Sequence, residues 1–210
     1  MLMVDGPEPF IQRTRRKYSM KWNRHPEYEG RHSFLSASQC HWLNYTPDKI
    51  ISRFENEQAK QRGTELHEFA SEAIRHKIKL LPGNTHPAVA NFVNDAIGYR
   101  MDSEVLLFYS PYAFGTADAI RYDPPKKDNP RGFLRIHDLK TGVTKPKMEQ
   151  LLVYAAYFCL EYGVKPEKTD FELRIYQGND IKTYIPEAED VYDVYHTIKE
   201  FSGILESKPK

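Results

Sequence analysis

IHDLKTG, residues 136–142, holds a carboxylate and an ammonium two positions apart, at Asp138 and Lys140, among apolar residues. Residues at this spacing on a β-strand point to the same face. The stretch therefore predicts a strand that ends just before a Thr–Gly turn and carries both charges side by side. A carboxylate binds hard divalent cations, and an ammonium stabilises charge on a phosphate oxygen. Because an Asp-x-Lys pair on an exposed strand is also commonly a solvated ion pair, its role depends on the rest of the chain.

The hydrophobic pattern on both sides of this stretch changes between a helical period and a strand period. The pattern predicts an α/β fold with a central mixed β-sheet flanked by helices. We expect Phe69 to face the core, Asp190 to cap the last helix, and Gly163 to end the helix before it. The predicted helices cover 36–43, 46–54, 58–79, 87–100, 149–162 and 190–205, and the predicted strands cover 103–110, 114–122, 132–139, 170–176 and 181–185.

The bulk composition fits one globular domain, residues 33–210, after a basic and irregular N-terminal arm, residues 1–32. The net charge of the 210 residues is only +1, so any contact with nucleic acid depends on local basic clusters. Each cluster is either a phosphate-binding surface or an ordinary solvated run. The candidate DNA-binding residues are Arg13, Arg15, Arg16 and Lys17 in the arm, then Lys126 and Lys127, and Lys145 and Lys147.

The chain has two cysteines, Cys40 and Cys159. Two are too few for a disulfide framework, a four-cysteine zinc site or an iron–sulfur cluster. We expect Cys159 to be a buried thiol and the compartment to be reducing and cytoplasmic. No signal peptide is visible and no apolar run approaches the length of a membrane span.

Three further features converge on Asp138 and Lys140. Asp118 lies in the preceding strand, within FGTADAI, residues 114–120. If the two strands pair antiparallel, the two carboxylates meet at one end of the sheet, although Asp118 would also suit an edge strand or a turn. His67, on the long helix, is either a metal ligand or a hydrogen-bonded core histidine.

Gln150 and Tyr154 share one face of the helix after the Asp-x-Lys strand, because they are four residues apart. Both side chains can therefore project over the end of the sheet. A glutamine and a phenol in that place can position a water, the lysine or a phosphate. They can equally be an ordinary buried polar pair.

In this order the motifs resemble those of the PD-(D/E)XK nuclease superfamily, in particular its RecB-type nuclease domain. That family reads Gly-x-x-x-His, Gly-x-x-Asp, Asp-x-Lys-Thr-Gly and Gln-x-x-x-Tyr. The resemblance spans about residues 33–185 and implies a restriction-endonuclease-like core. The matching segments are Gly63 to His67, Gly115 to Asp118, Asp138 to Gly142, and Gln150 to Tyr154.

The resemblance also implies roles for these residues. His67, Asp118, Asp138 and the Leu139 backbone carbonyl would bind Mg²⁺ or Mn²⁺, and Glu104 would support them or join a second cation. Lys140 would be the catalytic lysine, with Gln150 and Tyr154 as accessory residues. Because the cysteines of the iron–sulfur members of the family are missing, we expect no cluster.

The expected activity is metal-dependent hydrolysis of DNA, by an exonuclease in phage-type recombination, repair or processing. Its partners would be DNA ends, a single-strand-annealing or replication protein, or further copies of the chain, and Trp22, Trp42 or Tyr112 could stack on bases. An endonuclease of the same fold, a non-catalytic DNA-binding accessory protein and a small-molecule metallohydrolase are the alternatives.

Overall fold

The computed structural model describes residue 26 and residues 33–81 and 83–208, and the chain divides into two compact units, residues 1–50 and 51–210. The described part of the first unit holds a 3-10 helix, η2 (Ala37–Asn44), where the sequence predicts a helix over 36–43. There the half-buried Trp42 donates its indole N–H to the Ser36 carbonyl at 2.9 Å.

The second unit contains a five-stranded mixed sheet in the order β1-β2-β3-β4-β5. Only β3 and β4 run parallel, because helix α3 carries the chain back between them, and the other neighbours are antiparallel. This arrangement confirms the predicted α/β fold with a mixed sheet. The strands are β1 (Asp102–Ser110), β2 (Ala113–Asp123), β3 (Gly132–Lys140), β4 (Thr169–Gln177) and β5 (Asp180–Tyr184).

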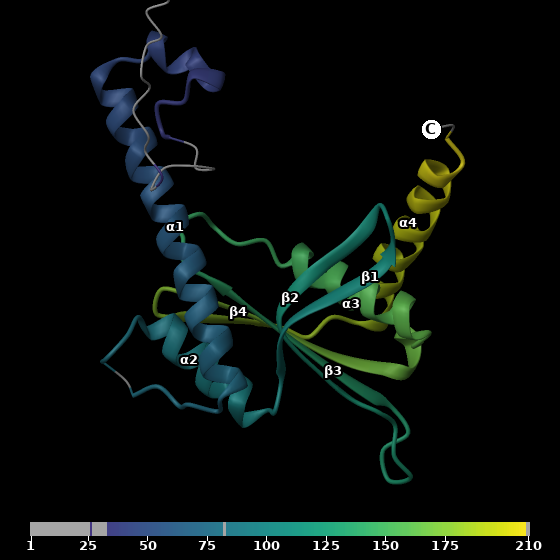
Figure 1. Ribbon diagram of the computed structural model, residues 1–210. Coiled ribbons are helices and arrows are strands. Elements are labelled where there is room, and N and C mark those ends of the chain that lie inside the picture. Colours follow the sequence, from purple (N-terminus) through teal and green to yellow (C-terminus); the bar gives the residue numbers. More distant parts are fainter. Residues whose placement is uncertain (1–25, 27–32, 82, 209–210) are drawn as a thin grey trace, which may run out of the picture. The chain divides into compact units, whose positions relative to one another are not determined.

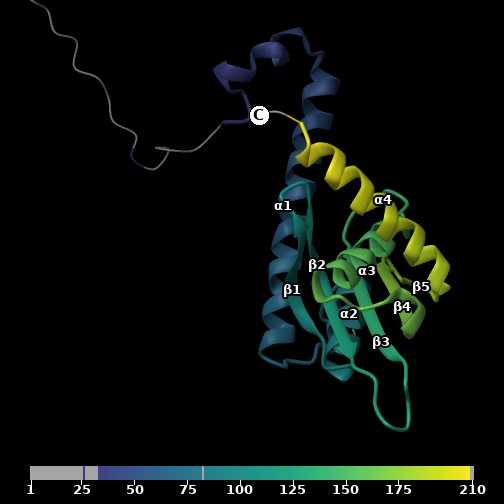
Figure 2. The same ribbon diagram turned by 90° about the vertical axis from the view of Figure 1, so that its right-hand side faces the viewer.

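Helices cover both faces of the sheet (Figures 1 and 2). Side chains of α1 and α2 pack on one face around Leu139 and Tyr176, and α3 and α4 pack on the other around Ile136 and Leu173. No helix in the described part of the chain is long and apolar enough to cross a membrane. The helices are α1 (Pro47–Arg75), α2 (Pro87–Gly98), α3 (Glu149–Tyr162) and α4 (Ala188–Glu206), with a short 3-10 helix, η3 (Pro166–Lys168), before β4.

Local sequence explains where several of these elements end. Gly163 adopts a left-handed conformation with φ of 63° and closes α3, as predicted. The thiol of Cys159 is buried, also as predicted. Gly178, with φ of 61°, makes the turn of the hairpin formed by β4 and β5.

Three details of the helices differ from the prediction. The segments 46–54 and 58–79 form the single helix α1, because nothing between them breaks a helix, and α1 ends at Arg75. Phe69 is exposed, since the shorter side chains of its neighbours make the contact with the core. Asp190 is not the cap of α4: Glu187 is, and Asp190 accepts a hydrogen bond from the Glu187 N–H at 3.0 Å.

Candidate functional site

An irregularity in β1 shapes the candidate site. Glu104 has φ of 53°, a left-handed conformation that a non-glycine residue adopts only when its surroundings impose it. The ladder pairs on either side are Ser103 with Ala119 and Val105 with Ala117. Glu104 therefore stands opposite Asp118. At this position β1 changes which of its side chains face α1.

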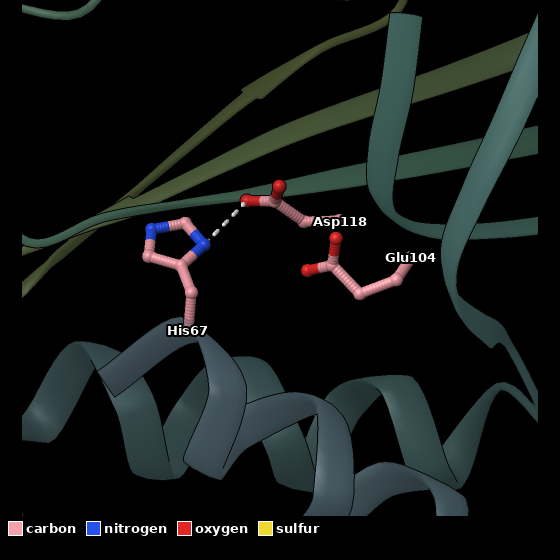
Figure 3. Close-up of side chains that lie close together, drawn as sticks. All are labelled: His67, Glu104 and Asp118. Atoms are coloured by element: carbon pink, nitrogen blue, oxygen red, sulfur yellow. Dashed lines mark ion pairs between the residues drawn. The ribbon is translucent and has the colours of Figure 1, made fainter. Parts of the chain in front are cut away.

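Three side chains from three elements meet at this irregularity (Figure 3). His67 extends from α1 toward the sheet, Glu104 comes from β1 and Asp118 from β2, and each offers one ligand atom within 4.8 Å of the others. His67 Nδ1 lies 3.5 Å from Asp118 Oδ2. An imidazole and two carboxylates are donors that divalent cations accept.

The electrostatics of this cluster favour a cation. Burial, together with the negative charge of Asp138, raises the pKa of Asp118 from its ordinary value of 3.8 to about 7, against the hydrogen bond that Oδ2 accepts from the Leu139 N–H at 2.8 Å. Burial lowers the pKa of His67, so the ring is neutral and free to act as a ligand near neutral pH. A bound cation would relieve the repulsion between the carboxylates, so these residues fit a metal ion.

A second polar group lies beside the cluster and links β3 to α3. Lys140 Nζ lies 3.1 Å from Asp138 Oδ1, 3.0 Å from Asp138 Oδ2 and 3.0 Å from Gln150 Oε1. Gln150 Nε2 in turn donates to Asp138 Oδ1 and to the Tyr154 hydroxyl, at 3.3 Å each. Four of the residues singled out in the sequence thus form one continuous network that holds the ammonium in place.

Asp138 is the buried centre of that network. Its carboxylate is only 2% exposed, and Oδ2 accepts no well-directed hydrogen bond from the described residues, its one partner being the Lys140 charge. Asp138 is not one of the three residues of the His67 cluster. Its charge nevertheless helps to raise the pKa of Asp118, so the two carboxylates share one electrostatic environment.

Two glycines allow the elements around the site to approach closely. A Cβ added to Gly63 on α1 would lie 2.9 Å from Thr141 Oγ1, and one added to Gly115 on β2 would lie 3.0 Å from the Tyr154 ring. Gly63 therefore lets α1 approach the turn after β3, while Gly115 lets Tyr154 lie against β2. These contacts join the segments that the resemblance treats as four separate motifs.

The cluster opens into a groove of about 1220 Å³ between α1, the β1–β2 hairpin and the loop after β3. Gln177, at the end of β4, supports that loop by donating to the carbonyls of Gly142 and Thr144, the latter at 2.9 Å. Sequence reasoning missed Gln177, since nothing local marks it. The groove is lined by Arg53, Asn56, Ala59, Lys60, Gly63, Thr64, His67, Glu68, Ser71, Glu72, Arg75, Glu104, Thr116, Asp118, Thr141, Gly142, Val143 and Thr144.

The candidate DNA-binding lysines lie in different places. Lys126 and Lys127 belong to the β2–β3 loop, at the opposite end of β3 from Asp138 and therefore far from the cluster. Lys145 and Lys147 are exposed and directly follow the loop that borders the groove. The arm residues Arg13, Arg15, Arg16 and Lys17 lie outside the described residues.

Comparison with known proteins leaves the site to be interpreted from its own geometry. No protein-family model, curated protein or solved structure matches the chain significantly.

Proposed function

We propose that the chain is a divalent-cation-dependent deoxyribonuclease that hydrolyses phosphodiester bonds, with the restriction-endonuclease-like core and the RecB-type domain that its motifs resemble. The observation that carries the proposal is the spatial convergence of all four motifs. The carboxylates, the histidine, the lysine and the glutamine–tyrosine pair come from five elements. His67, Glu104 and Asp118 line one open groove, and the Leu139 N–H and the charge of Asp138 link Asp118 to the lysine network.

In this proposal, His67, Glu104 and Asp118 hold Mg²⁺ or Mn²⁺, and Asp138 and the Leu139 carbonyl complete the set that the resemblance implies. When bound, the cation would polarise the scissile phosphate and acidify a water. The fit rests on the donor types, on their mutual distances and on the raised pKa of Asp118. The chain offers no cysteine pattern for an iron–sulfur cluster.

In this proposal, the ammonium of Lys140 is the catalytic positive charge that the protein itself supplies, in addition to the bound metal ion. Asp138 and Gln150 fix its ammonium by contacts of 3.0 to 3.1 Å, which removes the freedom that a lysine side chain normally has. A fixed ammonium stabilises the charge that develops on the phosphate oxygens or orients the attacking water. Tyr154 is a positioning residue, because it reaches Lys140 only through Gln150.

The proposed substrate is DNA, cut from an end during recombination, repair or processing, and the partners would be DNA ends together with a single-strand-annealing or replication protein. An open groove suits a polymer better than a closed pocket would, and this favours a nuclease over a small-molecule metallohydrolase.

The test is one gel. End-labelled linear single-stranded and double-stranded DNA and closed-circular DNA are incubated with the protein and Mg²⁺, Mn²⁺ or EDTA. We expect linear DNA to be degraded with either cation and to survive in EDTA. Nicking of circular DNA would show an endonuclease instead, and intact DNA in every lane would overturn the proposal.

Two variants tie the activity to the site. Asp118→Asn and Lys140→Ala should each lower the cleavage rate by about 10³-fold, the order of loss expected when a group that stabilises the transition state is removed. Lys126→Ala, at the far end of β3, is the matched control and should cleave like the wild type. Cleavage that survives Lys140→Ala would mean that another site is responsible.

A further inference from the structure

One wall of the groove carries positive charges that no described residue neutralises. Arg53 and Lys60 lie on α1, seven residues apart and so on one face of the helix, and both line the groove. Within the described part of the chain neither side chain forms an ion pair or a hydrogen bond. Arg75, at the other end of the groove, is instead paired with Glu72. The available positive charge therefore lies on one side of the His67 cluster.

The β1–β2 hairpin, which borders the groove, carries exposed aromatic rings beside it. Phe108 of β1 pairs with Phe114 of β2 across the ladder, and Leu106 pairs with Thr116, so these four side chains share one face of the hairpin. Thr116 lines the groove, which places the aromatic pair beside it. Phe108 is 45% exposed and Phe114 is 55% exposed, and their rings stack with centroids 6.1 Å apart.

We propose that this groove binds a single strand of nucleic acid, with its phosphates on Arg53 and Lys60 and its bases stacked on the Phe108–Phe114 pair. The proposal deepens the proposed function and rests on it, since it assigns the strand that the His67 cluster receives. A groove with unpaired cations and exposed aromatic rings beside it is the combination that holds single strands without reading their sequence.

The aromatic pair favours a single strand over a duplex. Bases inside a duplex are stacked on each other and present only their edges, whereas the bases of a single strand are free to stack on a protein ring. An uncovered pair of phenylalanines gains little from a duplex, whose outer surface is phosphate. The same pair matches the apolar faces of unpaired bases.

The test is binding in EDTA, where we expect no cleavage to interfere. Fluorescence anisotropy measures the affinity of the full-length protein for a labelled oligothymidylate and for a duplex of equal length, at several salt concentrations. We expect the single strand to bind more tightly. Phe114→Ala should weaken binding of the single strand by about 5- to 100-fold, the range for loss of one base–aromatic stack, and should leave duplex binding nearly unchanged.

Matched substitutions make the two halves of the proposal separately falsifiable. Phe201→Ala removes an equally exposed phenylalanine from α4 and should have no effect. Arg53→Ala should reduce the slope of log affinity against log salt by about 0.7, the value for one phosphate contact to a single strand. Arg62→Ala, on the same helix but outside the groove lining, should leave the slope unchanged.

Equal losses in Phe114→Ala and Phe201→Ala, or equal slopes in Arg53→Ala and Arg62→Ala, would overturn this assignment of the groove. If the wild type cleaves DNA but these variants bind the single strand as the wild type does, the proposed strand-binding role of the groove fails while the proposed nuclease activity stands. If the wild type binds the single strand as expected but shows no metal-dependent cleavage, the proposed nuclease activity fails while the strand-binding role of the groove stands.

Discussion

Two clusters of histidine and carboxylate lie on the α1–α2 side of the sheet, and they differ in how their charges are balanced. In the His67 cluster, Glu104 and Asp118 face an open groove, and among the described residues neither carboxylate is paired with a lysine or an arginine. In the second cluster, Asp95 of α2 accepts hydrogen bonds from the Tyr176 hydroxyl at 2.7 Å and from Arg174 at 3.1 Å.

The histidines show the same contrast. His137 is fully buried, its Nδ1 lies 3.2 Å from the Tyr176 hydroxyl, and burial together with the charge of Arg174 lowers its pKa to about 3. His67 is 30% exposed. Burial lowers its pKa, the charges of Asp138 and Glu104 oppose that effect, and the charge of Lys140 adds to it. The same residue types therefore form a structural network where Tyr176 and Arg174 donate to the carboxylate, and a candidate binding site where the carboxylates face an open groove.

The sharpest way to break this comparison is to remove one acid from each cluster. Asp95→Ala leaves Arg174 Nη1 without its acceptor and the Tyr176 hydroxyl with only the longer contact to His137, so the free energy of unfolding should fall by about 2 kcal/mol. Asp118→Asn relieves repulsion and should leave the metal-free protein as stable as the wild type, or more so. Urea denaturation in EDTA measures both. Equal destabilisation by the two substitutions would remove the distinction between the clusters.

The second prediction concerns pH. Because the pKa of Asp118 rises from 3.8 to about 7 on folding, the folded protein holds this proton more tightly than the unfolded chain does. Its contribution to stability is fully present below pH 4 and is lost as the pH rises through 7. The difference in unfolding free energy between the wild type and Asp118→Asn, measured in EDTA, should therefore shift against the wild type between pH 4 and 7. A difference that stays constant would contradict the assigned pKa.

The smallest expected effect tests the contact between α1 and the loop after β3. Replacing a helical glycine by alanine normally stabilises a helix by up to about 1 kcal/mol. Gly203→Ala on α4 should show this gain, because no atom lies within 4 Å of the new Cβ, whereas Gly63→Ala should not, because Thr141 Oγ1 is 2.9 Å away. Thermal unfolding compares the two, and adding Thr141→Ala to Gly63→Ala should restore the gain. Equal gains in both single variants would show that the contact is loose.

The sheet and its helices were predictable because their signals are local. The alternation around Ile136 and the helical period before Gly163 specify secondary structure within a few residues. β2 and β3 do pair antiparallel, which is the condition under which we expected Asp118 and Asp138 to meet at one end of the sheet.

The details of the site were not predictable from such signals. The left-handed conformation of Glu104 depends on packing between strands, and Asp138 is engaged by Lys140 and Gln150 from different elements. Arg53 and Lys60 look like solvated residues on a polar helix until the groove is seen. Candidate DNA-binding residues were instead selected from the sequence where lysines and arginines cluster along the chain. This selected Lys126 and Lys127, which lie at the far end of β3.

Direct measurement of cation binding tests the central claim. Isothermal titration of the metal-free protein with Mn²⁺ at pH 7.5 should show binding that is lost in Asp118→Asn and Glu104→Gln and retained in Asp95→Asn, which alters the balanced cluster. Retention of full Mn²⁺ affinity in Asp118→Asn and Glu104→Gln would contradict the account.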